Sequence, residues 1–323
     1  MAKVLVTGGA GYIGSHVARD LKNAGYEVRI YDDFSNGLEK RVKEFSDIFR
    51  GDILDRQALA KALQGIDSVI HLAAKKAVGE SVENPLKYYL NNVSGTLNLL
   101  EAMNINKVKK IVFSSTAAVY SPSEKAAIEE SDPTQPLSPY GATKLLSEEL
   151  IEKVAATEKL TSVSLRYFNV VGAGSDELGD NSRDNLVPKV FQALSASHSP
   201  EIYGDSYPTP DGTCIRDYIH VIDLSRSHLA ALKMVEEGAA GSSEIFNVGS
   251  GTGYSVREVI DQIEATIARS TGAKVVPPRA GDSPKLIASV AKIDKALGWR
   301  PELSLKDMID SAWRAWQSNE RSE

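Results

Sequence analysis

Tyr140 and Lys144 could together make a general base. They stand four residues apart just after Pro139, which suits the first turn of a helix, so both side chains would lie on one helix face, one turn apart. A free phenol titrates near ~10 and accepts a proton at neutral pH only when a nearby cation favours the phenolate. Lys144 can supply that charge. On an ordinary helix surface the same two residues would only pack and snorkel, so the interpretation depends on the rest of the chain.

A glycine-rich segment near residue 10 predicts a dinucleotide site. The apolar run 3–7 leads into Gly8, Gly11 and Gly14, and a helix-like stretch follows to residue 24. In that order, the glycines would allow a turn with positive φ, close approach of backbone to a diphosphate, and close contact of helix with strand. The N–H groups and dipole of the helix N-terminus favour the anion. Taken alone, the segment could also be a glycine-rich turn without a ligand.

The residue that ends the second strand candidate, 27–31, indicates which dinucleotide binds. Asp32 follows this strand, at the distance beyond Gly14 where a carboxylate accepts hydrogen bonds from the adenosine ribose hydroxyls. An acid at this point repels a 2′-phosphate, and no arginine occupies positions 33–37. We therefore predict NAD and not NADP as the cofactor. Asp33, the next residue, leaves open which of the two carboxylates binds the ribose.

Length and composition favour a soluble enzyme. The 323 residues suffice for a large buried core and two lobes. A formal net charge of −6 offers no overall attraction to nucleic acid or to an anionic membrane. The single cysteine, Cys214, has no disulfide partner and no partners for a metal cluster, so we predict a small buried residue and no metal site. A first strand from residue 3, and no apolar run near the ~20 residues that span a bilayer, favour a cytoplasmic protein.

Short apolar runs alternate with helical patterns in the first half of the chain. Such an alternation predicts an α/β fold, a Rossmann-type doubly wound parallel sheet covered on both faces. Besides 3–7 and 27–31, the expected strands are 48–50, 68–72, 110–114 and 162–168, and the expected helices are 56–64, 86–103 and 140–158. Ligands collect at the carboxyl ends of parallel strands. The segments expected to line one crevice there are 8–14, 32–37, 52–53, 73–76, 115–116 and Asn169.

The second half of the chain has a different character. Residues 172–210 are rich in Gly, Asp, Asn, Ser and Pro, which predicts irregular structure over a ligand with one helix near 185–196. We expect a smaller, mixed α/β substrate-binding domain over 171–323, after an NAD-binding Rossmann domain over 1–170. A strand near 244–248 should return to the first domain. The remaining predicted helices are 222–236, 255–269 and 304–316.

With these pieces placed, the sequence resembles the extended short-chain dehydrogenase/reductase superfamily and, within it, the UDP-galactose 4-epimerases, also called UDP-glucose 4-epimerases. The glycine segment indicates the superfamily, and the segments around Lys76 and over 207–221 indicate the epimerase branch. The matching segments span nearly the whole chain: 7–14, 33–37, 76–81, 91–93, 114–120, 140–144, 166–169, 207–221 and 279–282.

The resemblance implies reversible 4-epimerisation of UDP-galactose and UDP-glucose through a transient 4-keto sugar, with a tightly bound NAD. Tyr140 would remove the proton of the sugar 4-hydroxyl while hydride leaves C4 for the nicotinamide. Lys144 would bind the nicotinamide ribose and hold the phenol acidic. Thr116 would hydrogen-bond the same sugar hydroxyl. The resemblance also implies a homodimer that pairs the helices near 86–103 and 140–158.

The resemblance and the strand-end rule together give the candidate binding residues. Those expected around NAD are Gly8, Gly11, Tyr12, Ile13, Gly14, Asp32, Asp33, Phe34, Ser35, Asn36, Gly37, Asp52, Ile53, Leu72, Ala73, Ala74, Lys76, Asn92, Tyr140, Lys144 and Phe168. Those expected around the UDP-sugar are Lys76, Thr116, Tyr140, Asn169, Asn185, Leu186, Tyr203, Arg216, Tyr218, Arg279, Asp282 and Leu286.

Three residues of the second set have an interpretation of their own. Arg216 and Arg279 can each present a planar fork of donors to diphosphate oxygens, although an arginine in a polar loop is more often a surface residue. Leu286 matches the position that in relatives helps to set the room for a 2-N-acetyl group. A leucine is intermediate in size, so the N-acetylated pair of sugars remains an alternative substrate.

Related functions of the same superfamily fit the sequence to different degrees. Nucleotide-sugar 4,6-dehydratases need an acid–base pair just after Thr116, where this chain has Ala117 and Ala118, so elimination is disfavoured. Epimerases of UDP-glucuronate or UDP-pentoses would share the machinery. A non-catalytic NAD-binding protein is disfavoured because Thr116, Tyr140 and Lys144 are all retained.

The histidines and tryptophans receive no catalytic role. His71, His220 and His228 lack metal-ligand spacing and are expected at strand ends or on helix surfaces. Trp299, Trp313 and Trp316 are expected in core and lobe packing.

Overall fold

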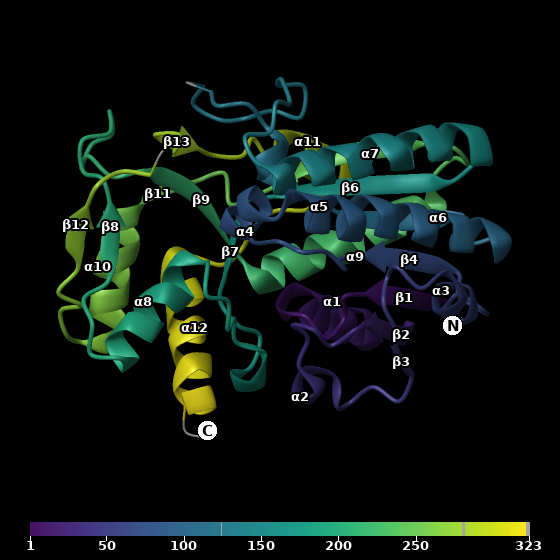
Figure 1. The fold of residues 1–323 in the computed structure, drawn as a ribbon, viewed down its shortest axis with the longest axis horizontal. Helices are drawn as coiled ribbons and strands as arrows, with labels where there is room; N and C mark the ends of the chain where they lie inside the picture. The colour runs from purple at the N-terminus through teal and green to yellow at the C-terminus, as the bar shows by residue number, and fades with distance from the viewer. Residues whose placement is uncertain (124, 280–281, 321–323) are drawn as a thin grey trace.

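The computed structural model describes residues 1–123, 125–279 and 282–320, and its centre is a parallel sheet. The seven strands run in the order β10-β6-β5-β4-β1-β2-β3 (Figure 1). All neighbouring pairs are parallel, which confirms the predicted α/β, Rossmann-type fold. The strands are β1 (Lys3–Thr7), β2 (Glu27–Asp32), β3 (Ile48–Arg50), β4 (Ser68–His71), β5 (Lys110–Ser114), β6 (Thr161–Tyr167) and β10 (Ser243–Val248).

Helices cover both faces of this sheet because successive strand residues point to opposite sides. Val4 and Val6 belong to a core shared with α1 (Tyr12–Asn23) and α9 (Val221–Glu237). Leu5 belongs to a second core on the other face. The helices that contribute to this second core are α3 (Arg56–Ala62), α6 (Gly95–Ile105) and α7 (Pro139–Glu158).

A smaller lobe lies beside the carboxyl ends of the strands, at the left of Figure 1. Its four-stranded sheet consists of β7 (Asn169–Val171), β9 (Ile215–His220), β11 (Gly253–Ser255) and β13 (Lys285–Leu286), and β8 (Glu201–Tyr203) pairs with β12 (Lys274–Val276). The helices α8 (Leu186–Ser195), α10 (Val256–Ile267) and α12 (Leu305–Glu320) pack against these strands. Trp313 and Trp316 contact Phe191 in this core, as predicted for lobe packing.

The chain crosses between the lobes more than once. β10 pairs in parallel with β6 and completes the large sheet, as predicted for the strand near 244–248. α9 also returns, since it packs on the large sheet beside α1, and α11 (Ala291–Leu297) contacts both α9 and β10. The predicted domain boundary at residue 170 therefore does not separate the two lobes cleanly, because later segments return to the first lobe. The two-domain division stays a prediction.

The predicted helix over 86–103 is wrong as a single element. The structure has α4 (Val78–Glu83), α5 (Pro85–Tyr88), a π-helical segment η1 (Tyr89–Ser94) and then α6. Pro85 suits the first turn of α5. The buried side chain of Asn92, inside η1, bonds the backbone of Lys75 through its oxygen and its nitrogen, at 2.8 and 3.0 Å. These two hydrogen bonds to a distant segment coincide with the wider, π-helical turn of η1.

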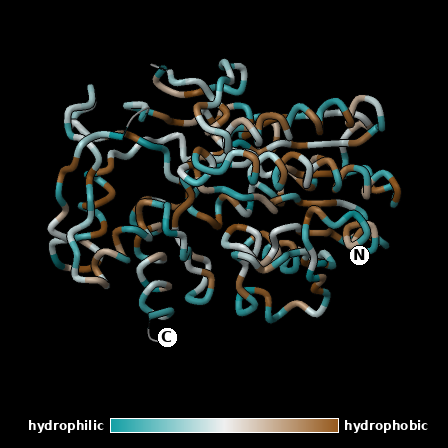
Figure 2. Tube along the Cα trace, in the orientation of Figure 1, coloured by the Kyte–Doolittle hydropathy of each residue, from teal (hydrophilic) through white to brown (hydrophobic). Residues whose placement is uncertain are grey.

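Several short elements were not predicted: α2 (Glu39–Val42), the 3₁₀ turns η2 (Ala117–Val119) and η3 (Asp176–Leu178), the helix α11, and the strands β7, β8, β9, β11, β12 and β13 of the smaller lobe. Figure 2 shows hydrophobic and hydrophilic residues alternating along the helices that flank the sheet. Within the described ranges, none of the helices combines the length and apolar character needed to cross a bilayer.

Cys214 is buried, as predicted. Three histidines were expected at strand ends or on helix surfaces: His71 ends β4 and His220 ends β9, as predicted, whereas a surface position is wrong for His228, which is buried in α9. His71, His220 and His228 are all buried and hydrogen-bonded, to Thr7 and Thr96, to Ser311, and to Ser114 respectively.

Candidate active site

Tyr140 and Lys144 lie on the buried face of α7, at the end where this helix meets the carboxyl end of β5. Ser138 caps the helix, with its Oγ accepting a hydrogen bond from the Gly141 N–H at 3.1 Å, and Pro139 follows as the first helical residue. A Cβ on Gly141 would overlap the carbonyl oxygen of Ala118. The glycine thus lets the first turn of α7 approach η2, the turn that follows Thr116.

The ammonium group of Lys144 is fixed in the protein interior. Its Nζ donates to the carbonyl oxygen of Ser114 at 2.7 Å and lies 4.7 Å from the centre of the Phe113 ring. Burial lowers the pKa of Lys144 to about 7, while the carboxylate of Glu148, one turn further along α7, raises it. Burial thus makes this lysine easier to deprotonate than an exposed one.

Tyr140 is less acidic in the protein alone than the sequence suggested. Burial raises its pKa to about 12, and a hydrogen bond with Thr116 only partly offsets this effect. In the chain alone the ammonium of Lys144 is directed at the Ser114 carbonyl and does not offset the effect of burial, so its role in holding the phenol acidic stays a prediction. Further positive charge is needed to favour the phenolate.

A buried network fixes α7 against the strand ends. Glu148 accepts two hydrogen bonds from Nε of Arg166, both at 3.1 Å, and one from its Nη2 at 2.6 Å. The Oγ of Ser115, the residue before Thr116, also donates to Glu148. On its other side Arg166 donates to Tyr120 Oη at 3.0 Å. The network joins the helix of the Tyr–Lys pair to the strand end that carries Thr116.

The glycine segment has the conformation that a phosphate site requires. Gly8 has a φ of +70°, and a Cβ on it would lie 2.8 Å from the backbone nitrogen of Ala73. A Cβ on Gly14 would overlap the carbonyl oxygen of Gly8. No side chain caps the N-terminus of α1 at Gly11, and no acidic residue stands in its first turn. These features confirm the predicted roles of Gly8 and Gly14 and fit a bound diphosphate.

The two carboxylates after β2 are distinguished by their surroundings. Asp32 is buried, and its two oxygens accept hydrogen bonds from the backbone N–H groups of Ala10, at 2.9 Å, and Phe34, at 2.8 Å. Burial raises the pKa of Asp32, and these two bonds lower it. Asp33 is exposed and accepts from the Ser35 N–H. Asp32 therefore fixes the glycine segment, while Asp33 is open to solvent.

One cavity of about 600 Å³ brings most of the predicted NAD residues together. Its wall includes Gly8, Gly11, Tyr12, Ile13, Gly14, Asp32, Asp33, Ser35, Asn36, Gly37, Ile53, Leu72, Ala73, Ala74, Lys76, Tyr140 and Lys144. The glycine segment and the Tyr–Lys pair thus open into the same space.

Four predicted cofactor residues do not line this cavity. Phe34 lies beneath the guanidinium of Arg50, at 4.5 Å, and Phe168 packs in a core with Val119 and Tyr120. Asp52 accepts a backbone hydrogen bond from Leu54. Asn92 holds Lys75, which does line the cavity. Asn92 therefore supports the wall of the cavity, and its direct contact with the cofactor stays a prediction.

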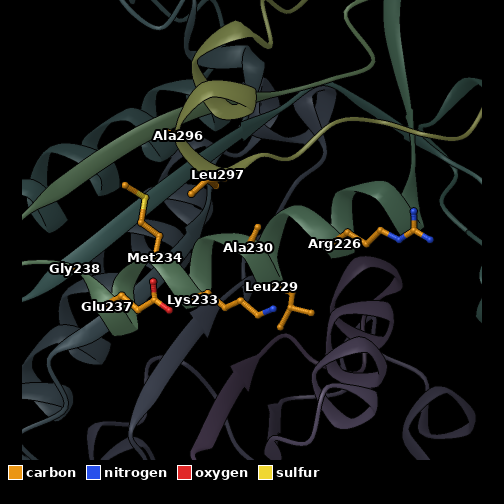
Figure 3. A pocket seen from close by; sticks show the side chains of 9 residues that line it. All are labelled: Arg226, Leu229, Ala230, Lys233, Met234, Glu237, Gly238, Ala296 and Leu297. Atoms are coloured by element: carbon orange, nitrogen blue, oxygen red, sulfur yellow. The ribbon is translucent and has the colours of Figure 1, made fainter.

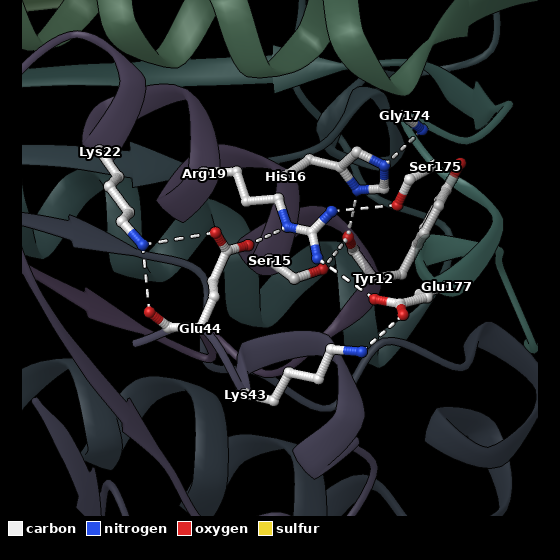
Figure 4. A network of polar contacts seen from close by, with 10 residues as sticks. All are labelled: Tyr12, Ser15, His16, Arg19, Lys22, Lys43, Glu44, Gly174, Ser175 and Glu177. Atoms are coloured by element: carbon white, nitrogen blue, oxygen red, sulfur yellow. Dashed lines mark hydrogen bonds and ion pairs between the residues drawn. The ribbon is translucent and has the colours of Figure 1, made fainter. Parts of the chain in front are cut away.

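Segment 172–184 of the second lobe crosses over the first lobe and is fastened to α1 and α2. Tyr12 Oη donates to the carbonyl oxygen of Gly172 at 2.6 Å, and the Gly174 N–H donates to His16 Nε2 at 2.8 Å. Figure 4 shows the bond between Gly174 and His16 together with the contacts of Arg19 and Lys43 to Glu177. Residues 180–184 continue into the cavity wall. The sequence predicted irregular structure here but not these attachments.

Most of the predicted UDP-sugar residues gather in the second lobe. Nη2 of Arg216 lies 3.4 Å from Oδ1 of Asp282, which makes an ion pair. Arg216 also stands opposite Leu286 where β9 pairs with β13. The guanidinium of Arg279 lies 3.7 Å above the ring centre of Tyr203. Asn169 and Tyr218 are register partners between β7 and β9, and Asn185 and Leu186 begin α8. Ala280 and Gly281, inside the predicted segment 279–282, lie outside the described residues.

A second hollow, of about 460 Å³, lies on the outer side of α9 beside α11. Figure 3 shows its lining, from Arg226 to Gly238 with Ala296 and Leu297. It contains none of the predicted site residues, and Arg226 is paired there with Glu302. In the described part of the chain, no cluster of three His, Cys, Asp or Glu side chains could hold a metal ion.

Several cavity residues escaped the sequence analysis. They are Tyr31, Arg41, Gly51, Ala77, Glu80, Tyr88, Asn91, Tyr167 and the run Asp180, Asn181, Ser182, Arg183 and Asp184. Arg41 offered no signal, since an arginine between Lys40 and Val42 in a polar segment resembles a surface residue. Lys75, by contrast, lies in the segment 73–76 that was expected at this strand end.

Comparison with known proteins gives one consistent family. The profile of the NAD dependent epimerase/dehydratase family matches residues 4–249. The UDP-glucose 4-epimerase of Corynebacterium glutamicum is 43% identical over 315 residues, covering 96% of this chain and 94% of that protein. A UDP-glucose 4-epimerase from Stenotrophomonas maltophila, solved with bound NAD and formylated UDP-arabinopyranose, superimposes with a TM-score of 0.95 at 37% identity over 100% of both chains. The UDP-Glc/GlcNAc 4-epimerase of Campylobacter jejuni superimposes with a TM-score of 0.86 at 36% identity, over 98% of this chain and 99% of that one.

Proposed function

The chain belongs to the NAD dependent epimerase/dehydratase family, and from this premise we propose that it is a UDP-glucose 4-epimerase. It interconverts UDP-galactose and UDP-glucose through a transient 4-keto sugar. The observation that carries the proposal is the position of Tyr140 and Lys144 in the wall of the cavity that the glycine segment also lines. A proton acceptor and a dinucleotide site thus share one space.

NAD, when bound, supplies the acceptor and later the donor of the hydride of C4. It also brings positive charge close to Tyr140, in a site where burial alone raises the pKa of the phenol. The cavity suits it, since the glycine backbone and the uncapped N-terminus of α1 fit a diphosphate.

The side chains of the protein transfer the proton and hold the UDP-sugar. Tyr140 takes the proton of the sugar 4-hydroxyl and returns it at the end of the cycle, and Thr116 hydrogen-bonds the same hydroxyl. Lys144 is held by the Ser114 carbonyl and tunes the acidity of the phenol by its charge. Arg216 and Arg279 bind the diphosphate of the UDP-sugar, which keeps the 4-keto sugar attached while its ring turns over.

Elimination of water is disfavoured by the residues after Thr116. A dehydratase needs an acid and a base there, and this chain has the apolar Ala117 and Ala118 in η2. The buried carboxylate nearest in sequence to the catalytic pair, Glu148, is occupied by Arg166 and Ser115. The two alanines carry no acid, and Glu148 is engaged with Arg166 and Ser115, so these residues cannot protonate a leaving hydroxyl.

The test is to incubate the purified protein with UDP-galactose and, separately, UDP-glucose, without added reductant, and to resolve the products by NMR. We expect both reactions to reach the same mixture, and the Tyr140→Phe variant to convert both sugars far more slowly than the wild type. Accumulation of a dehydrated sugar, or no conversion by the wild type, would refute the proposal.

A second candidate activity, on UDP-N-acetylglucosamine, is supported by Leu286. This residue is half-buried, pairs with Arg216 between β13 and β9, and packs against the core of Phe168 and Tyr120. A side chain of this intermediate size leaves more room than an aromatic one.

We expect Leu286→Tyr to lower the kcat/KM for UDP-N-acetylglucosamine at least about tenfold more than that for UDP-glucose, because overfilling a packed site costs ~1–3 kcal/mol. Leu286→Met, which conserves volume, is the control. An equal loss for both sugars in the tyrosine variant would contradict a role of Leu286 in selecting the substrate.

We also propose a homodimer formed through α4–α6 and α7. Exposed apolar side chains gather on these elements, namely Val78, Val82, Leu86, Tyr89, Leu90, Leu97 and Leu146. Such a set on one region is typical of an interface between protein chains. Light scattering after gel filtration should give twice the mass of the chain, and Leu86→Glu with Leu90→Glu should give the monomer mass. A wild-type monomer at micromolar concentration would contradict the homodimer.

A cytoplasmic location is proposed on the single, buried and unpaired Cys214, because proteins of reducing compartments do without disulfides. Cell fractionation tests it, and recovery of the protein outside the cytoplasm would contradict it.

A further inference from the structure

Arg41 is a buried cation on the short helix α2, and neither the sequence pattern nor the proposed mechanism gives it a role. Only 1% of its surface is exposed, and it is among the largest fully buried side chains of the protein. Its neighbour Lys40 lies on the same helix but is exposed, and its Nζ donates to Oδ1 of Asn319 at 2.7 Å. An arginine is rarely buried to this extent without an ionic partner.

The partners of Arg41 in the protein are neutral. Its Nη2 donates to the carbonyl oxygen of Gly179 at 2.6 Å and to Oδ1 of Asn181 at 3.1 Å. Its Nε is buried and has no hydrogen-bond partner. Among the residues that the structure describes, no carboxylate forms an ion pair with this guanidinium. Burying a charge without a counter-charge is costly, so the site as it stands is incomplete.

The nearest acidic groups are engaged elsewhere. The carboxylates of Asp180 and Asp32 both attract the guanidinium of Arg41 electrostatically, without a hydrogen bond to it. Asp180 accepts hydrogen bonds from the Ser182 N–H at 2.9 Å and from Asn185 Nδ2 at 2.6 Å. Asp32 accepts from the backbone of Ala10 and Phe34. Burial outweighs the attraction of both carboxylates and lowers the pKa of Arg41.

The position of Arg41 indicates which anion would complete the site. The residue lines the same cavity as Gly11, Tyr12 and Ile13, which form the N-terminal turn of α1, and Tyr12 is one of its electrostatic neighbours. A helix N-terminus contributes only partial positive charge, about half an elementary charge, whereas a diphosphate bridge carries two negative charges. A buried guanidinium beside that turn supplies a full charge and directional donors.

We propose that Arg41 is a binding residue for the diphosphate of the dinucleotide and that, through Gly179 and Asn181, it also holds segment 179–184 over this ligand. The inference rests on NAD being the cofactor. The anion neutralises a cation that the folded chain leaves unpaired, so its departure exposes that cation again. Slow release of the cofactor follows, as a reaction cycle that never exchanges NAD requires.

The test measures the rate at which NAD leaves the full-length holoenzyme after dilution, with the released NAD detected by a coupled dehydrogenase. Arg41→Gln keeps an amide donor for Gly179 but removes the charge, and it should release NAD at least about tenfold faster than the wild type, the effect of losing one charge-assisted bond. Arg41→Lys keeps the charge and should accelerate release by no more than about threefold. Lys40→Met, which removes a neighbouring exposed charge, should release NAD at the wild-type rate.

Comparing the NAD release rates of Arg41→Gln and Arg41→Lys distinguishes binding of the diphosphate by the charge of Arg41 from anchoring of segment 179–184. If Arg41→Lys releases NAD as fast as Arg41→Gln, or if neither differs from the wild type, Arg41 only anchors the segment and the proposal is overturned. A wild-type protein that holds no dinucleotide would instead refute the assignment of NAD itself. If Arg41→Gln does not give folded protein, Arg41→Met takes its place with the same expected result.

Discussion

The carboxylate of Glu148 is held by the guanidinium of Arg166, with Nη2 at 2.6 Å and Nε at 3.1 Å, and both side chains are buried. Glu148 stands one helical turn beyond Lys144 on the same helix, and Arg166 stands on β6. The pair therefore connects the helix that carries the Tyr–Lys pair with the sheet whose strand ends form the cavity.

Glu148→Gln should damage stability and also shift the pH dependence of activity. It leaves Arg166 buried without its counter-charge, which typically costs ~3–5 kcal/mol. It also removes the charge that raises the pKa of Lys144, so this pKa, about 7 in the wild type, should fall. The loss of activity with rising pH, as Lys144 gives up its proton, should then begin at lower pH. Urea unfolding and a pH–rate profile measure the two effects.

Glu149→Gln is the matched control for this variant, since Glu149 is the exposed neighbour on α7. It should change neither measurement. An unshifted pH profile in Glu148→Gln would mean that Glu148 has only a structural role.

Tyr140→Phe should keep NAD and lose most turnover. The substitution removes one oxygen from a buried ring and leaves the cavity wall in place. Removing a general base commonly lowers the rate ~10²–10⁴-fold. Single-turnover NMR assays and the NAD content of the purified variant are the two readouts. Near-normal turnover with retained NAD would exclude Tyr140 as the base.

The protein should lose stability steeply as the pH falls below about 6.5. Burial lowers the pKa of His16 and His71 to about 3 and that of His220 and His228 to about 4, in each case as the largest cause. The unfolded chain then binds more protons than the folded one from the ordinary histidine pKa downward. Stability is therefore complete above ~6.5 and is lost by up to about 1.4 kcal/mol per pH unit for each such histidine as the pH falls.

Urea unfolding between pH 7.5 and 4.5 measures this loss. His16→Asn should flatten the slope, because the Nε2 that accepts from Gly174 cannot do so once protonated. His198→Gln, at an exposed site, should leave it unchanged. A stability independent of pH over this range would show that the four histidines are not neutral in the folded state.

Gly14→Ala should lower both stability and NAD binding. The added methyl group would overlap the carbonyl oxygen of Gly8 and lie 2.9 Å from the Cα of Gly9, and neither backbone atom can move without opening the turn. We expect a loss of at least about 2 kcal/mol in the free energy of unfolding. The melting temperature and the NAD content measure it.

Gly79→Ala is the contrasting variant. Gly79 lies exposed in α4, and a Cβ there would meet nothing within 4 Å. It should stabilise the protein by up to about 1 kcal/mol through the higher helix propensity of alanine. Equal effects of the two substitutions would contradict the packing role of Gly14.

The sheet and the catalytic pair could be predicted because their signals are local. Short apolar runs bounded by turn residues predicted β5 at its observed bounds, and Pro139 predicted the start of α7 within one residue. The glycine spacing and the strand-end rule predicted about half of the cavity wall.

The features that sequence analysis missed depend on contacts between distant segments. Arg41 is buried by Gly179 and Asn181, of which Gly179 stands 138 positions further along the chain. Asn92 is held in a π-helical turn by Lys75, and His228 is buried against Ser114. A local polar pattern predicts exposure for such residues, and only the tertiary packing can reverse it.

The pairing of β10 with β6 limits where the protein chain can be truncated. A chain that stops near residue 170 would possess every glycine and both members of the Tyr–Lys pair, yet β6 would be an unprotected edge. The apolar surface now under α9 would also face water. Such a fragment would aggregate before it could serve as a portable nucleotide-binding module. Fusion and library designs built on this scaffold must therefore carry the chain at least through Val248.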